Sequence, residues 1–149
     1  MKLESPPATP QGPDAFGPLI NATCELVGVA PATAWLDLPM KDYRCATFQV
    51  DGVECLVSHR SIDPEALFIH CVFGPVPEVR SADALLALLQ LNLTLYGGGS
   101  PSFGADTERN LLLCMEERVQ GLQAAALAQT LENLAMQAIA WKKVWLAHE

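Results

Sequence analysis

Apolar residues near the start of the chain recur at the spacing of a helix. Leu19, Ile20 and Val27 mark this period, which predicts a short helix over residues 16–29. Residues 1–15, which precede it, are rich in proline and show no hydrophobic period. We therefore expect a flexible tail followed by a helix.

The next part of the chain has short runs of β-branched and aromatic residues separated by turn residues. Tyr43–Val50 and Val53–Arg60 flank the dipeptide Asp51-Gly52, which tolerates the two positive φ angles of a type I′ hairpin turn. A third run, Ala66–Phe73, ends before a Gly-Pro-Val-Pro sequence. The pattern predicts a three-stranded antiparallel meander.

A leucine-rich helix is predicted after the meander. Ser81 can cap this helix, and Asp83 in its first turn favours the helix dipole. From Ala84 to Tyr96 the leucines surround the helix axis, and a helix that is apolar all round must be covered on every side. A small sheet covers one face. The other is covered either by the same helix of a second copy, since most soluble oligomers are twofold homodimers, or by a larger core of the same chain.

A second hairpin and a long final helix complete the pattern. The hairpin is expected near residues 102–117, where turn residues separate two short runs. From about Gln120 an apolar stripe that includes Leu127, Leu131 and Trp141 follows helical spacing. The predicted fold class is α+β in the order α-β-β-β-α-β-β-α, with a twisted antiparallel sheet packed with helices.

The length and the net charge of the chain limit the number of domains and the class of partner that we expect. A chain of 149 residues is long enough for a single domain, which we place at residues 16–149. Nine basic against seventeen acidic residues give a net charge of −8, which repels nucleic-acid phosphates and anionic lipids. The sequence has no apolar segment typical of a membrane span or a signal peptide. We expect a cytoplasmic protein whose partner is a protein or a small molecule.

The residues that are capable of catalysis form no recognisable constellation. Gly99–Gly104 has the glycine spacing of a phosphate loop, but Ala105-Asp106 stands where the lysine and hydroxyl should follow. His59 is expected at a solvated strand end, and His70 and Cys71 point to opposite faces of one strand. The sequence therefore predicts no enzyme activity.

The five cysteines, at positions 24, 45, 55, 71 and 114, are interpreted as structural thiols. Four of them lie inside apolar runs, as small buried thiols do, whereas a disulfide or a metal site is the alternative. The smallest spacing, ten positions from Cys45 to Cys55, is too wide for a pair of zinc ligands. We expect no metal and no cofactor.

Several stretches taken in order resemble a known family. They are Leu88-Leu-Gln-Leu-Asn92, Tyr96-Gly-Gly-Gly-Ser-Pro-Ser-Phe-Gly-Ala-Asp106 and Asn110-Leu-Leu-Leu-Cys114, followed by a last helix that contains tryptophan. The chain resembles the class I type III secretion chaperones of the Tir-chaperone (CesT-type) family. The resemblance covers about residues 16–147 and leaves out the proline-rich tail, which is unusually long for this family.

The resemblance implies an ATP-independent, cytosolic homodimer of Gram-negative bacteria. Such a chaperone binds the N-terminal chaperone-binding segment of an effector and keeps it extended and ready for the secretion ATPase. Physically, an extended segment is held by backbone pairing at sheet edges and by apolar pockets for alternate side chains. This activity needs neither a catalytic group nor a nucleic-acid or membrane partner.

The resemblance also implies two surfaces. The twofold interface of relatives matches the leucine-rich helix and the residues just beyond it, namely Leu85, Leu88, Leu89, Asn92, Tyr96 and Phe103. The effector groove of relatives matches the first helix and the start of the sheet, namely Leu19, Ile20, Leu26, Val27, Trp35, Leu36, Leu38, Phe48 and Val50.

Two other classes of function remain open on sequence alone. One is a regulatory binding protein of the same fold that sequesters another secretion component, and the other is a small-molecule or thiol enzyme. The identity of the neighbouring gene distinguishes a chaperone from these two classes, because a secretion chaperone is usually encoded beside its effector.

Overall fold

The computed structural model describes residues 15–96 and 101–145, with side chains described as far as Lys143. The predicted tail thus lies almost entirely outside the described residues, as does Gly99 of the candidate phosphate loop.

The described residues form nine elements in the predicted order, with one short helix added. The helices are α1 (Phe16–Val27), α2 (Pro31–Ala34), α3 (Ser81–Leu95) and α4 (Ala124–Trp145). The strands are β1 (Tyr43–Val50), β2 (Val53–Arg60), β3 (Asp63–Pro75), β4 (Ser102–Ala105) and β5 (Asn110–Arg118). The predicted α+β class is confirmed, and α2 is the element that the sequence pattern did not show.

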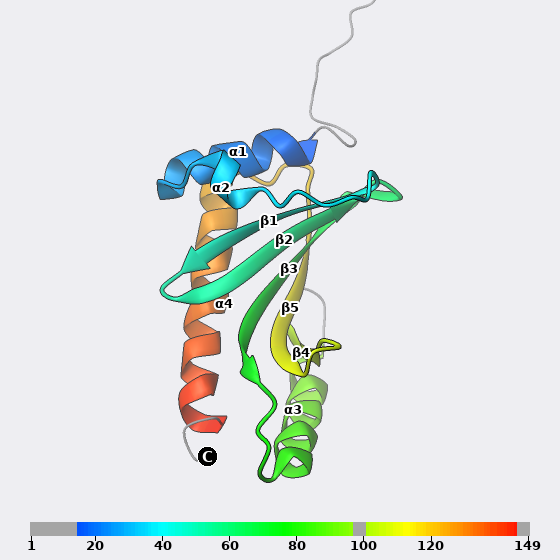
Figure 1. Cartoon of the computed structure of the whole chain (residues 1–149), viewed down its shortest axis with the longest axis vertical. Helices are drawn as coiled ribbons and strands as arrows, with labels where there is room; N and C mark the ends of the chain where they lie inside the picture. The colour runs from blue at the N-terminus through cyan, green and yellow to red at the C-terminus, as the bar shows by residue number, and fades with distance from the viewer. Residues whose placement is uncertain (1–14, 97–100, 146–149) are drawn as a thin grey trace, which may run out of the picture.

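The strands form one antiparallel sheet in the order β1-β2-β3-β5-β4 (Figure 1). Asp51 and Gly52 join β1 to β2 with φ angles of 52° and 82°, which confirms the predicted hairpin turn. In the turn between β4 and β5, the Asp106 Oδ1 atom accepts hydrogen bonds from the backbone N–H groups of Glu108 and Asn110, at 2.9 and 2.8 Å.

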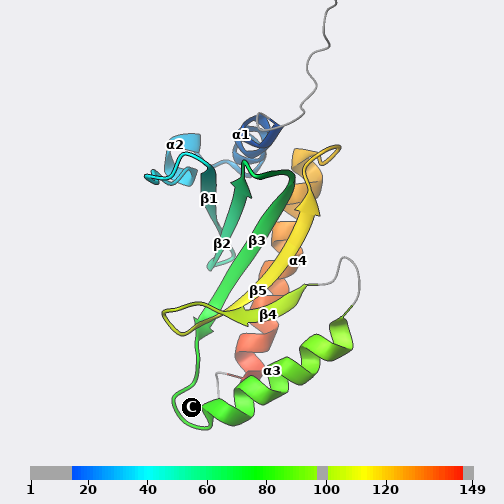
Figure 2. The ribbon, with the colours of Figure 1, turned by 90° about the vertical axis from the view of Figure 1, so that its right-hand side faces the viewer.

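Helices cover one face of this sheet and lie at both of its ends. Helix α4 runs along one face and contacts β1, β2 and β3, while α1 packs against α4 at the end of the sheet where α2 also lies (Figures 1 and 2). Helix α3 lies at the opposite end, against β4. The two ends of the sheet therefore carry different helices.

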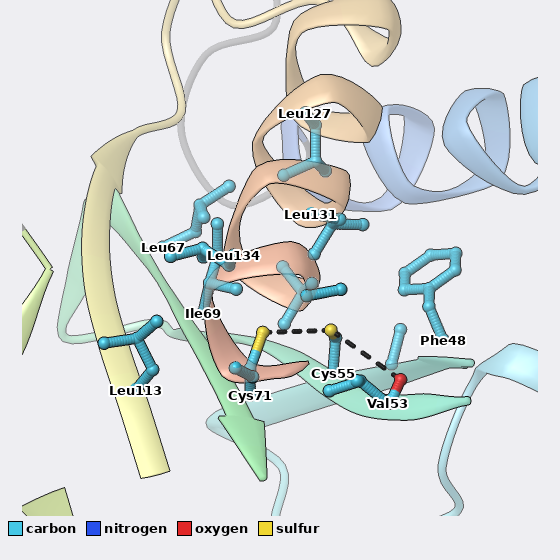
Figure 3. Packing of buried hydrophobic residues seen from close by; sticks show 14 of the residues in the cluster. Phe48, Val53, Cys55, Leu67, Ile69, Cys71, Leu113, Leu127, Leu131 and Leu134 are labelled. Carbon is cyan, nitrogen blue, oxygen red and sulfur yellow. Dashed lines mark hydrogen bonds between the residues drawn. The ribbon is translucent and has the colours of Figure 1, made fainter. Parts of the chain in front are cut away.

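The core lies between α4 and the sheet (Figure 3). Leu127, Leu131 and Leu134 of α4 are fully buried, as are Leu67 and Ile69 of β3. Full burial of one such side chain contributes about 1.5–3 kcal/mol, so this layer stabilises the domain strongly.

The start of α3 corrects one expectation. Arg80 rather than Ser81 occupies the N-cap position, with a φ angle of 61° and no side-chain capping hydrogen bond. The Arg80 Nε atom instead donates to Asp83 Oδ2 at 3.1 Å. Because Ser81 is already the first helical residue, its hydroxyl does not stand at the position where an N-cap accepts a hydrogen bond.

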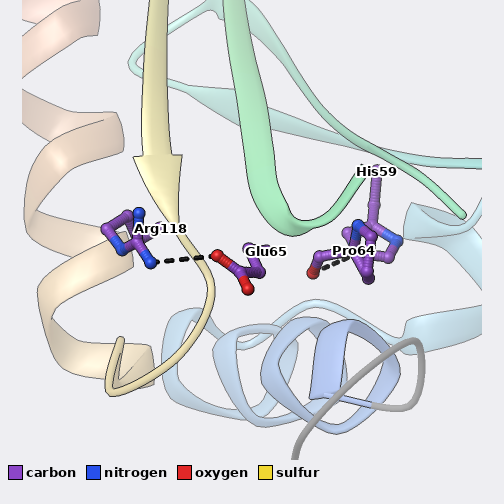
Figure 4. Close-up of polar contacts among 4 residues, drawn as sticks. All are labelled: His59, Pro64, Glu65 and Arg118. Carbon is purple, nitrogen blue, oxygen red and sulfur yellow. Dashed lines mark hydrogen bonds and ion pairs between the residues drawn. The ribbon is translucent and has the colours of Figure 1, made fainter. Parts of the chain in front are cut away.

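His59 was expected at a solvated strand end, and the structure shows that this is wrong. Its side chain is only 3% exposed, and its ring stacks on Phe16 of α1 with the centroids 4.9 Å apart. Its Nε2 atom lies 3.0 Å from the carbonyl oxygen of Pro64, next to the ion pair between Arg118 and Glu65 (Figure 4). The strand pattern missed this burial because α1, which is distant in sequence, covers the end of β2.

All five cysteines are free, and four of them are buried, while Cys114 is partly buried. Cys55 and Cys71 face each other across β2 and β3 with their Sγ atoms 2.9 Å apart (Figure 3). The hydrogen bond with Cys55, together with burial, raises the pKa of Cys71, and burial raises the pKa of Cys24, Cys45 and Cys114. The interpretation as buried free thiols is confirmed for Cys24, Cys45, Cys55 and Cys71.

We expect these thiols to react slowly in the native protein. The thiolate is the reactive form, and both burial and a raised pKa reduce its availability. Absorbance after addition of Ellman's reagent should rise slowly for the native chain and rapidly for all cysteines in guanidinium chloride. Rapid modification of one cysteine in the native protein would contradict this prediction and favour a thiol enzyme.

Candidate functional site

A groove of about 500 Å³ opens between α1, the β1–β2 hairpin and α4. Phe48 of β1 and Leu131 of α4 are almost completely buried and form its base, whereas Leu26 and Val27 of α1 are exposed along its wall. The lining residues are Leu26, Val27, Val29, Phe48, Gln49, Val50, Asp51, Ala125, Ala128, Gln129, Leu131 and Glu132. The groove is therefore apolar at its base and polar at its rim.

The end of α1 creates the exposed wall of this groove. Gly28, with a φ angle of 77°, ends the helix, and the backbone N–H of Val29 donates to the carbonyl of Cys24 at 2.9 Å. The opposite side of α1 buries Phe16 and Ile20. Leu26 and Val27 are thus apolar residues that the other described residues leave exposed, and they form an accessible hydrophobic surface.

Strand β1, an edge strand of the sheet, runs beside the groove. Its outer edge is covered near Ala46, which forms a bridge with Trp35, and the Leu36 N–H donates to the carbonyl of Cys45 at 3.0 Å. Farther along β1, at Gln49, no strand among the described residues pairs with this edge. Unpaired backbone groups on such an edge can hydrogen-bond an added extended segment.

The structure brings together part of the set assigned to the effector groove. Leu26, Val27, Phe48 and Val50 all line the groove. Leu36 and Leu38 lie instead in the segment between α2 and β1, with Leu36 exposed and Leu38 partly buried.

The remaining members of that set have structural contacts within the chain. Leu19 and Ile20 are buried in the core, because α1 turns them away from solvent. The Trp35 Nε1–H donates to Asn21 Oδ1 at 2.9 Å, and its ring packs edge-on against Phe16. These contacts hold α1 and α2 in place, and the three residues are not among those that line the groove.

Sequence reasoning missed the wall that α4 contributes. Ala125, Ala128, Gln129 and Glu132 are small or polar and lie off the apolar stripe of that helix. Such residues ordinarily form a solvated helix face, so no local signal marks them. Their contribution depends on α1 and the hairpin being packed beside α4.

A second candidate surface lies on α3, which the described residues of its own chain cover only in part. Ala84 and Leu88 are the buried residues of this helix. A shallow hollow of about 210 Å³ lies between α3 and the β4–β5 hairpin and is lined by Leu85, Leu88, Leu89, Asn92, Phe103, Gly104, Ala105 and Leu111. The exposed apolar side chains of α3 and its end are Leu86, Leu89, Leu93 and Tyr96.

The set assigned to the twofold interface divides into accessible and internal residues. Leu89 and Tyr96 are exposed and Leu85 is partly exposed, whereas Leu88 is buried. Phe103 is also buried, because its ring packs edge-on against Phe73 and Trp141 with centroids 5.7 Å away in each case. Two exposed leucines that were absent from the assigned set, Leu86 and Leu93, enlarge the accessible surface.

Asn92 joins α3 to β4. Its Nδ2 atom donates to the carbonyl of Phe103 at 2.9 Å, and the Phe103 N–H donates to its Oδ1 atom at 2.7 Å. The side-chain amide thereby pairs with the β4 backbone in the way that a neighbouring strand does. Asn92 was assigned to the interface between copies, but its polar groups are used within the chain.

We expect Asn92→Ala to lower the free energy of unfolding by about 1–3 kcal/mol, because it leaves the Phe103 backbone groups without this partner. Urea denaturation measures the loss, and hydrogen exchange should locate it in α3 and β4. Gln90→Ala, at an exposed position of the same helix, is the matched control. Equal stability of the two variants would show that the amide pairing contributes little.

Residues 36–142 match the sequence model of the Tir chaperone protein (CesT) family. The chain belongs to this family. The resemblance seen in the sequence is thereby confirmed, and the groove and the α3 surface are features of a CesT-family protein. A comparison with curated protein sequences gives no significant match.

Solved structures share the fold at low sequence identity. The ExsC–ExsE complex contains a chain with a TM-score of 0.65 and 15% identity, covering 89% of this chain and 95% of that one. The Yersinia pestis type III secretion chaperone SycH in complex with a stable fragment of YscM2 gives 0.60 and 14%, covering 84% and 98%. The HopA1–SchA chaperone–effector complex gives 0.56 and 16%, covering 88% and 92%.

In the described part of this chain, no helix is long and apolar enough to cross a membrane.

Proposed function

We propose that this protein is a homodimeric type III secretion chaperone in the cytoplasm of a Gram-negative bacterium. Its client is the N-terminal segment of an effector, which it keeps extended and available to the secretion ATPase. The observation that carries the proposal is the apolar groove beside the edge of β1 in a chain of the CesT family. Chains of the same fold are described in complex with an effector or with a fragment of another protein, which supports it.

The groove and the strand edge suggest how a client is held without catalysis. An extended segment adds to the sheet along β1 beyond Ala46, using backbone hydrogen bonds that are indifferent to sequence. Alternate side chains of the segment then enter the groove and contact Leu26, Val27 and Phe48. A segment bound in this way cannot fold on itself, so it stays competent for secretion.

The α3 surface is the proposed contact between two copies. Leu86, Leu89 and Leu93 expose large apolar areas that a second copy of the same helix would remove from water. A twofold dimer places one groove on each copy, so that one effector segment can contact both. The expected stoichiometry is therefore two chaperone chains for each client segment.

Co-purification with the product of the neighbouring gene tests this function. The full chain is co-expressed with the N-terminal region of that product, and the complex is analysed by light scattering and limited proteolysis. We expect a complex of two chaperone chains with one segment, in which the segment lacks a folded core. If no segment from a neighbouring gene binds, the protein is instead a regulatory binding protein of the same fold.

A further inference from the structure

The polar groups at the rim of the groove share one electrostatic character. Asp51 and Glu132 contribute carboxylates and Gln49 and Gln129 contribute amides, and all four residues are exposed. Among the described residues that line the groove, there is no lysine, arginine or histidine. An apolar base thus lies under a rim that carries negative charge.

The positions of the rim groups are set by the elements that carry them. Asp51 occupies the first central position of the β1–β2 turn, and Glu132 follows the buried Leu131 on α4. The Gln129 Nε2 atom donates one of its two hydrogens to Asn133 Oδ1 at 3.2 Å, and the Gln129 Oε1 atom can accept a hydrogen bond from a ligand. Together with the two carboxylates, it gives the rim several acceptor oxygens.

Among the described residues, neither Asp51 nor Glu132 belongs to an ion pair such as Arg80–Asp83 or Arg118–Glu65. The lysines of α4, Lys142 and Lys143, lie in its last turn, about 15 Å along the helix from Glu132. At physiological ionic strength this distance exceeds the screening length of about 8 Å. The charge at the rim is thus available to a ligand.

We propose that the groove selects segments in which a lysine or arginine lies two positions from an apolar anchor. The inference rests on the proposed function and adds the charge of the client to it. In an extended segment, residues i and i+2 point to the same side. An apolar side chain at position i can therefore contact Phe48 while the side chain at position i+2 reaches the rim. The aliphatic stem of a lysine or arginine also packs on Leu26 or Val27 while its charged end reaches a carboxylate.

Synthetic peptides that differ only in charge test this selection. Three fluorescent 12-residue peptides carry the same alternating leucine and serine residues, except that lysine, glutamine or glutamate replaces two of the leucines. Each replaced position then lies two positions from a leucine and on the same side of the extended segment. We expect the lysine peptide to bind the full chain about tenfold more tightly than the glutamate peptide at low salt, with the glutamine peptide between them. The difference should shrink in 0.5 M NaCl, because salt screens exposed charges.

Variants of the rim connect this preference to the groove. The double substitution Asp51→Asn and Glu132→Gln should remove most of the preference, and asparagine tolerates the positive φ angle at position 51. The double substitution Glu78→Gln and Glu108→Gln makes the same change in net charge at exposed positions outside the groove, and it should retain the preference. Anisotropy titrations measure all of these affinities.

The possible outcomes separate the charge selection from the chaperone function. If the three peptides bind equally well and Val27→Asp weakens all of them, the groove takes extended segments but the charge selection is wrong. If the preference persists in the rim variant, the selecting charge lies elsewhere and the inference is also wrong. If no peptide binds, the groove does not take extended apolar segments, which contradicts the proposed function as well.

Discussion

A chain carrying Leu89→Arg is expected to be a monomer at micromolar concentrations where the wild type is a dimer. Leu89 is 64% exposed on α3, so the single chain can accept arginine there without losing core contacts. In a twofold interface the substitution removes two buried leucines and places two unpaired charges in an apolar contact. We expect the dissociation constant of the dimer to rise by at least about 100-fold, which corresponds to about 2.7 kcal/mol.

Light scattering coupled to gel filtration measures this change against a chain mass of 16.1 kDa. Met136→Arg, at a position 62% exposed on α4, introduces the same charge outside the α3 surface and should remain dimeric. Circular dichroism checks that both variants are folded. A wild-type protein that is itself monomeric at micromolar concentration would contradict the proposed interface.

Val27→Asp is expected to weaken binding of the client segment by about 2 kcal/mol, or about 30-fold. Val27 is 45% exposed at the wall of the groove, so aspartate there is solvated in the free chain and desolvated beside an apolar client side chain. Calorimetry with the segment encoded by the neighbouring gene measures the loss. The dimer should remain intact, because Val27 lies on α1 and the proposed contact lies on α3.

The control for this substitution is Ile62→Asp. Ile62 is 85% exposed at the turn between β2 and β3, outside the groove, and its replacement should leave the affinity unchanged. Trp35 and Phe48 are poorer test positions despite their aromatic area. Phe48 is buried and Trp35 donates to Asn21, so their substitution also perturbs folding. Wild-type affinity in a folded Val27→Asp chain would exclude the groove as the client site.

The parts of the fold that sequence predicted well depend on local chemistry. Asp51-Gly52 determines the turn between β1 and β2 by its tolerance of positive φ angles, whatever packs around it. The leucines of α3 predicted a helix with more apolar surface than one chain covers, and the structure leaves Leu86, Leu89 and Leu93 exposed. Both features depend on residues that are close together in the sequence.

The expectations that failed depend on contacts between distant segments. The burial of His59 requires α1 to cover the end of β2, and the burial of Phe103 requires Trp141 from the last helix. Hydrophobic period placed Ile20 and Val27 in one helix, but it could not show which of them faces the core. For the same reason, the sequence could not show that Glu132 lines the groove, because this position depends on how α4 packs beside α1 and the hairpin.

The pairing of Asn92 with Phe103 makes the two edges of the sheet unequal. In the four-residue strand β4, the outward N–H and carbonyl of Phe103 are held by a side-chain amide, which makes this edge a poor template for another chain. Among the described residues, no strand pairs with β1 beyond Ala46. The sheet can therefore accept a new strand at its β1 edge, whereas its β4 edge resists one. Edge-to-edge stacking of copies into a fibre needs both edges of the sheet, so a blocked β4 edge stops such stacking from propagating.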